Sequence, residues 1–268
     1  PRPLACARFR RVLFRSSQAF GVRQVPILRP LGWLAHGWRD LWQAPLASLA
    51  QGLVMALFGA LLLAVAHDRF WLLSGAFSGF LLLAPVMATG LYALSRDIDR
   101  NLPVGLSTVW LAWHPRDGRL IAFGILLAVA GTGWVLCSAA LITGFAPEPI
   151  VTPRDFLLKV VLNEQSSLFE TWLGLGALLA APVFASSVVA IPALLDQPAD
   201  RLGVYGAVLT SWRVVLEHPA PMALWAALLM GLTTLGLATA LLGLIVIVPW
   251  LGHASWHAYR DLVRHRSD

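Results

Sequence analysis

The sequence predicts an all-α membrane protein: a polytopic bundle of six transmembrane helices, arranged as three hairpins that each follow an interfacial amphipathic helix. Three observations support this class. Six apolar stretches carry no formal charge, and each approaches the roughly 20 residues that cross a bilayer as a helix. Hydrophobic residues make up 58% and charged residues 13% of the chain, and its mean hydropathy of +0.71 excludes a water-soluble fold. A tryptophan-containing motif also repeats along the chain.

The six stretches define the domain organisation. They are expected at Pro45–Ala66, Phe70–Leu94, Leu120–Phe145, Thr171–Leu195, Ala220–Leu241 and Leu242–Tyr259. Residues 45–264 would form the transmembrane domain, residues 17–44 a cytoplasmic segment with an interfacial helix, and residues 265–268 a cytoplasmic tail. Residues 1–16 include a stretch that reads like a translated sequencing adaptor, so we expect them to be a non-native or disordered tail.

The distribution of basic residues predicts the orientation. With six spans, the side that holds both termini carries 17 of the 20 Lys and Arg residues, and the other side carries three. Cytoplasmic loops are enriched in these residues, so both termini are expected in the cytoplasm. The basic residues include a single lysine, which fits a GC-rich bacterial genome. We therefore expect a multi-pass protein of the bacterial cytoplasmic (inner) membrane.

An internal repeat predicts the interfacial helices. Trp38 and Arg39 precede Pro45 with the spacing W-R-x5-P, and Trp212 and Arg213 precede Pro219 with the same spacing. A looser version, with two tryptophans, precedes the third span. Apolar residues recur at helical spacing in all three segments. Tryptophan favours the headgroup zone of a bilayer, so we expect interfacial anchors at Trp38, Arg39, Trp110, Trp113, Trp212 and Arg213. Packing of these helices on the protein's own loops is the alternative.

The second helix of each predicted hairpin contains proline. Proline removes a backbone hydrogen bond and can kink a transmembrane helix. Kinks are expected at Pro85, Pro182, Pro192 and Pro249. Such kinks can form gates, but they more often only shape the packing.

The external linker between the third and fourth spans predicts one more helix. Phe156, Leu157, Val160 and Val161 recur at helical spacing, with charged residues on the other faces. We expect a short amphipathic helix here, which would cap a cavity, dock a partner or rest on lipid.

One pair of residues points to a specific chemistry. His253 and His257 are four residues apart and therefore share a helix face. This spacing suits a metal ion, a haem or a proton path, but two histidines supply only half of a zinc site. A structural pair, hydrogen-bonded to loops or headgroups, is the alternative interpretation.

Other chemistry is not indicated. The spans contain no Asp, Glu, Lys or Arg, the residues on which ion-coupled transporters and proton pumps usually depend. No zinc-protease, nucleophile-elbow or phosphate-loop motif is present, so no enzyme activity and no cofactor are expected. The basic residues are spread through loops, which argues against nucleic-acid binding.

Several segments resemble the bacterial integral membrane proteins grouped as domain-of-unknown-function family 2189. The similarity covers about residues 22–264, and its most specific part is the closing segment Gly252–Leu262. The family implies an inner-membrane protein with no established activity. Some members carry the label of a cytochrome c oxidase subunit. A catalytic oxidase subunit needs histidines on several spans, whereas only His253 and His257 lie within the spans predicted here.

These observations leave two classes of function and a third hypothesis. The preferred class is a noncatalytic scaffold, accessory or contact module whose partners are membrane lipid and an unidentified membrane protein or a second copy of the chain. The alternative is a small-molecule channel or permease with a path between the three hairpins. A redox or metal-binding role of the two histidines is the third.

Overall fold

The computed structural model describes residues 21–66, 88–114, 118–146, 148–163 and 166–264. Helices dominate this part of the chain, which confirms the all-α class. The helices are α2 (Arg29–Gln43), α3 (Pro45–Ala66), α5 (Thr89–Asp99), α6 (Leu106–Trp113), α7 (Arg119–Phe145), α8 (Pro153–Phe156), the π-helix η1 (Leu157–Val161), α9 (Leu168–Ser187), α10 (Ala190–Asp196), α11 (Val204–Glu217), α12 (Pro219–Ala238) and α13 (Leu244–Leu262). Two short strands, β1 (Gly21–Val22) and β2 (Val263–Arg264), pair antiparallel.

Four segments of the described chain are long and apolar enough to cross a membrane. They are Pro45–Ala64, Arg119–Phe145, Leu168–Asp196 and Pro219–Ala238. The predicted second span lies outside the described residues except for its end, which belongs to α5. The predicted sixth span forms α13 but is not among the four, because its second half is polar. Six spans and a hairpin arrangement are therefore not confirmed.

The repeated motif has a repeated backbone geometry. Ala44 ends α2 with φ −132° and ψ 57°, and His218 ends α11 with φ −130° and ψ 55°. His114 ends α6 with φ −113° and ψ 65°. A proline follows each of these residues and disfavours the helical conformation of the residue before it. The proline therefore explains why each amphipathic helix stops where it does, and α2 and α11 stop immediately before the long apolar helices α3 and α12.

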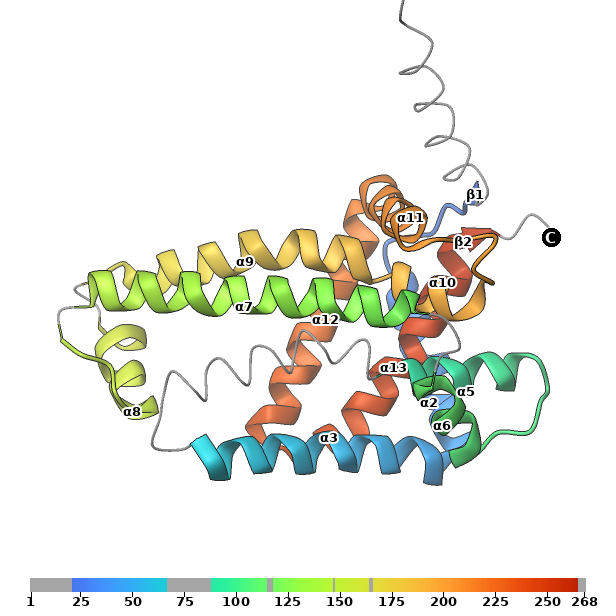
Figure 1. Ribbon diagram of the computed structural model, residues 1–268, viewed down its shortest axis with the longest axis horizontal. Coiled ribbons are helices and arrows are strands. Elements are labelled where there is room, and N and C mark those ends of the chain that lie inside the picture. Colours follow the sequence, from blue (N-terminus) through green and yellow to red (C-terminus); the bar gives the residue numbers. More distant parts are fainter. Residues whose placement is uncertain (1–20, 67–87, 115–117, 147, 164–165, 265–268) are drawn as a thin grey trace, which may run out of the picture.

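Two of the three amphipathic helices pack on helices that precede them in the chain, and α2 packs on α13. Among the described helices, α6 packs on α5, and α11 packs on α9 and α10. Helix α2 packs on α13, so the first amphipathic helix contacts the last described helix, and in this sense the series of helix contacts closes into a ring. These helices, α10 and both strands gather at one end of the molecule, and α8 lies at the other end (Figure 1).

Glycines allow α13 to approach its neighbours closely. A Cβ at Gly37 of α2 would lie 2.5 Å from the amide nitrogen of Ala254, and one at Gly52 of α3 would lie 2.1 Å from the carbonyl oxygen of Ile245. On α13 itself, a Cβ at Gly252 would lie 2.4 Å from the side chain of Leu91. Helix α13 therefore lies directly against the backbones of α2 and α3.

The predicted fourth span consists of two helices. Helix α9 ends at Ser187, and α10 begins at Ala190. Pro192 lies in the first turn of α10, where its ring prevents a continuous helix through the preceding turn. The backbone N–H of Val189, left free by this break, donates to Ser211 Oγ of α11 at 3.1 Å. Pro182 and Pro249 lie inside α9 and α13, and Pro85 lies outside the described residues.

The external linker is helical, as predicted, and its apolar side faces the protein. Val160 of η1 is fully buried in a small cluster with Ile142, Ile150 and Leu168. Leu157, which was predicted on the same apolar stripe, is 48% exposed, because the π-helix turns this residue away from the cluster.

Candidate functional site

A chain of buried hydrogen bonds surrounds His253. Its Nδ1 lies 2.7 Å from Ser95 Oγ of α5, and its Nε2 lies 2.8 Å from Ser48 Oγ of α3. All three side chains are fully buried. Each imidazole nitrogen therefore has a hydroxyl partner, which satisfies a polar ring that would otherwise be costly inside an apolar bundle.

Asp40 connects this chain to the second histidine. Ser95 Oγ donates to Asp40 Oδ2 at 2.6 Å, and His257 Nε2 lies 2.8 Å from the same oxygen. Burial, the largest single influence, would raise the pKa of Asp40, but the hydrogen bonds from His257 and Ser95 and the charge interactions with His257 and His253 together hold this pKa below its ordinary value. The exposed His36 packs beside His257, with ring centroids 5.2 Å apart. The polar chain therefore runs from the surface of α2 to α3.

The rest of the closing segment forms contacts of the same kind. Its polar side chains make hydrogen bonds to α2, α5 and α10. Trp256 Nε1 donates to Asp99, Tyr259 OH donates to Asp196, and Asp261 accepts from Trp33 Nε1 and Arg29. Just before this segment, Trp250 Nε1 donates to the carbonyl of Leu34. The closing segment of α13 is thus held by hydrogen bonds to α2, near the start of the described chain, as well as to α5 and α10.

The metal hypothesis for His253 and His257 stays a prediction. The two rings lie on one helix face, as expected, but they contact serines and a carboxylate. Within the described ranges, no group of three or more His, Cys, Asp or Glu side chains is placed to hold a metal ion.

The predicted interfacial anchors fall into two groups. Trp38, Arg39, Trp110 and Arg213 are exposed on α2, α6 and α11, as anchors require. Trp113 and Trp212 are half-buried. Trp212 Nε1 donates to Ser186 Oγ at 2.8 Å, so this ring packs on the end of α9 and matches the alternative of packing on the protein itself.

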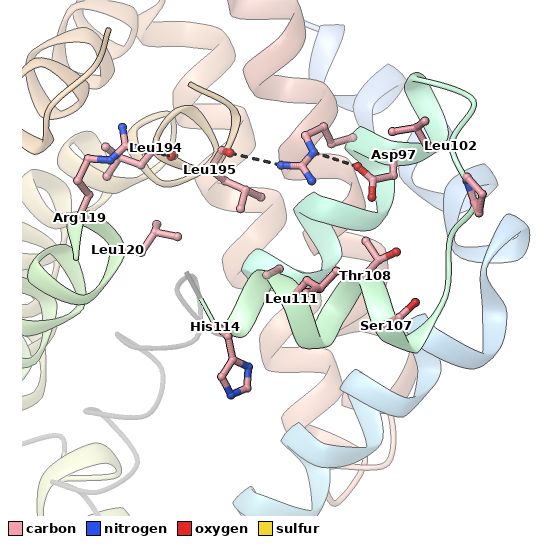
Figure 2. A pocket seen from close by; sticks show the side chains of 13 residues that line it. Asp97, Leu102, Ser107, Thr108, Leu111, His114, Arg119, Leu120, Leu194 and Leu195 are labelled. Carbon is pink, nitrogen blue, oxygen red and sulfur yellow. Dashed lines mark hydrogen bonds and ion pairs between the residues drawn. The ribbon is translucent and has the colours of Figure 1, made fainter. Parts of the chain in front are cut away.

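A pocket of about 760 Å³ lies at the same end of the molecule, between α5, α6, the start of α7 and α10. Its wall combines two arginines, one carboxylate and hydroxyl groups with an apolar rim (Figure 2). The lining residues are Arg96, Asp97, Leu102, Pro103, Ser107, Thr108, Leu111, Ala112, His114, Arg119, Leu120, Leu194 and Leu195. No motif predicted this pocket, because its residues come from four separate segments.

Both arginines of this pocket bind the carbonyl end of α10. Arg119 donates to the carbonyls of Leu194, Gln197 and Leu202. Arg96 donates to the carbonyl of Leu195 and to Asp97 (Figure 2). Cations near a helix C-terminus satisfy its last carbonyls and its dipole, so the two arginines position α10.

A second, mostly apolar cavity of about 260 Å³ lies deeper, between α3, α5, α9, α12 and α13. Its few polar lining groups are Tyr92, Ser187, Thr233 and Ser255. Ser187 and Ser255 donate to carbonyls of their own helices, so their hydroxyl protons are not available to a molecule in the cavity.

Comparison with known proteins supports the membrane class. No curated protein and no solved structure matches the chain. The matched part of the chain runs from the predicted second span to the end of α10 and does not include the closing segment, which the sequence suggested as the most specific part. Residues 72–196 match the model of the DUF2189 family, described as predicted integral membrane proteins, which confirms over this range the family resemblance seen in the sequence.

Proposed function

We propose that this chain is a noncatalytic module of the bacterial inner membrane that acts through contacts with lipid and with a membrane partner or a second copy of itself. One observation carries the proposal. The histidines, tryptophan, tyrosine and aspartate of the closing segment, the strongest chemical pattern in the sequence, are engaged in contacts within the chain. Groups used in this way hold helices together.

The exposed surface supports the same proposal. Trp110 is 64% exposed and Leu111 is 69% exposed on α6, and Trp42 is 58% exposed on α2. Large apolar and aromatic side chains at the end of a membrane bundle suit contact with the headgroup layer or with an amphipathic partner. The gathering of the amphipathic helices and both strands at one end supports a shared side for the two termini, and the basic residues favour the cytoplasm.

The proposal is tested on protein purified from native membranes after gentle crosslinking. We expect stoichiometric lipid, a reproducible membrane-protein adduct or dimer, and neither metal nor haem. Stoichiometric metal or haem that is lost in a His253→Gln variant would contradict the noncatalytic proposal and favour the redox hypothesis. Absence of both lipid retention and any adduct would also contradict it.

A channel or permease is the second candidate, supported by the cavity between α5, α9, α12 and α13. Its test is release of a size-graded series of uncharged solutes from proteoliposomes. Leu251→Trp would fill the cavity from α13, and Leu126→Trp, on the exposed side of α7, is the matched control. Transport that only the first variant blocks would favour the permease. Vesicles as tight as protein-free ones would reject it.

A further inference from the structure

The pocket between α5, α6, α7 and α10 contains hydroxyl groups without partners. Thr108 lines this pocket, and its hydroxyl makes no hydrogen bond within the described residues; the side chain is 8% exposed, and its oxygen is open to the pocket, not sealed inside the protein. Ser107 lies beside it in the first turn of α6 and is exposed to the pocket (Figure 2). Hydroxyl groups that face the pocket without a protein partner are free to donate to a polar group bound in it.

The charge of the pocket indicates the sign of that group. Arg96 uses two of its five N–H donors, one to Asp97 and one to the carbonyl of Leu195. Arg119 adds a second positive charge, and Asp97 is the one carboxylate among the lining residues. Figure 2 shows the ring of His114 pointing away from the other labelled side chains. A net positive wall with free guanidinium and hydroxyl donors matches an oxyanion such as phosphate.

The position of the pocket indicates where the anion comes from. Leu111 both lines the pocket and is 69% exposed, and its neighbour Trp110 is exposed on the same helix. Helix α6 therefore presents an apolar surface next to the pocket at the level where a tryptophan ring meets lipid headgroups. A basic pocket between helices at the cytoplasmic side suits the headgroup of an anionic lipid.

We propose that this pocket binds a phosphate group, with Thr108, Ser107 and the free N–H groups of Arg96 as its donors. The phosphate belongs to an anionic lipid headgroup or is free in solution, and the experiment separates these sources. Only the lipid source rests on the lipid contact proposed above. Arg119 is a positioning residue, because its described hydrogen bonds go to backbone carbonyls around the end of α10.

The test measures binding by the full chain in phosphatidylcholine nanodiscs. One arm titrates phosphatidylglycerol into the nanodiscs. The other arm titrates inorganic phosphate into the same nanodiscs with their lipid composition unchanged. The variants are Ser107→Ala combined with Thr108→Val, and Arg96→Gln. Matched controls are Thr210→Val, a buried threonine of α11, and Arg154→Gln, an exposed arginine of α8 at the other end of the molecule. Loss of donors to a charged group should weaken binding about tenfold or more in the variants and leave the controls unchanged.

The two arms give separate outcomes. Tenfold weaker phosphatidylglycerol binding in the variants, without measurable phosphate binding, assigns the pocket to a lipid headgroup. Phosphate binding that the variants weaken assigns it to a free anion. Unchanged affinities in the hydroxyl variant, or equal losses in the controls, would overturn the site. Lipid that stays bound along the apolar faces in that case would leave the proposed lipid contact intact. If Arg96→Gln does not fold, the hydroxyl variant decides alone.

Discussion

Gly52→Ala is the most direct test of the close packing between α3 and α13. The new Cβ would lie 2.1 Å from the carbonyl oxygen of Ile245, although real Cβ atoms essentially never come closer than 3.0 Å to such a neighbour. The atoms it meets belong to the backbone of α13, so no side-chain rotation relieves the clash. Helices α3 and α13 must therefore separate locally by about 1 Å.

The separation has a cost that follows from the contacts nearby. Ser48, one helical turn before Gly52, lies 2.8 Å from His253 across the same interface, and this hydrogen bond would lengthen beyond a useful distance. Overpacking costs about 1–3 kcal/mol, and the lost hydrogen bond adds about 1 kcal/mol. The better helix propensity of alanine returns up to about 1 kcal/mol. We expect a net loss of about 1–3 kcal/mol in the free energy of unfolding.

The measurement is unfolding of the purified variants by denaturing detergent in mixed micelles. Gly133→Ala in α7 is the control, because a Cβ there meets nothing within 4 Å and should leave stability unchanged or raise it by less than about 1 kcal/mol. Gly52→Ala that is as stable as Gly133→Ala would refute the close packing of α3 against the α13 backbone.

Three further predictions concern the buried polar chain, acid stability and topology. His253→Leu removes the partner of the buried Ser48 hydroxyl and one of the two partners of Ser95, which keeps Asp40, so it should cost about 1–3 kcal/mol, measured in the same detergent titration; an unchanged midpoint would contradict the role of this histidine. At Asp40 and Asp261, hydrogen bonds and charge interactions together outweigh burial and lower both pKa values. The stability that these carboxylates contribute is therefore present above the ordinary pKa of 3.8 and is lost as the pH falls below it. Thermal unfolding should show this loss of stability in acid, and the loss should be smaller in Asp261→Asn than in the unmodified protein. Cysteine labelling should reach residues 146–167 from outside and residues 95–118 from inside, and the reverse pattern would contradict the orientation.

Local sequence patterns predicted where two of the amphipathic helices end. The motif W-R-x5-P placed a break before Pro45 and before Pro219, and both breaks occur with nearly the same backbone angles. This prediction works because its cause is local: proline restricts the residue directly before it. The shared helix face of His253 and His257 was equally predictable from spacing alone.

The partners of these histidines could not be predicted in the same way. Ser48 and Ser95 lie 205 and 158 residues from His253 along the chain, and nothing in their local sequence distinguishes them from other serines of the apolar helices. Asp40 lies on an amphipathic helix, where a carboxylate is usually solvated, yet packing against α13 buries it. Trp212 was predicted at the lipid interface but packs on Ser186, since the position of α9 is a tertiary feature.

The contact of α2 with α13 brings together the two ends of the described chain, where β1 pairs with β2. A chain whose ends meet in this way should tolerate circular permutation. Linking the ends and opening the loop between α5 and α6 would turn the longest-range contact of the fold into a local one. In the natural order, α2 is synthesised before α13, so their contact forms only after α13 has been made. The packing of α2 therefore has to wait for α13, and the permuted chain would remove that delay.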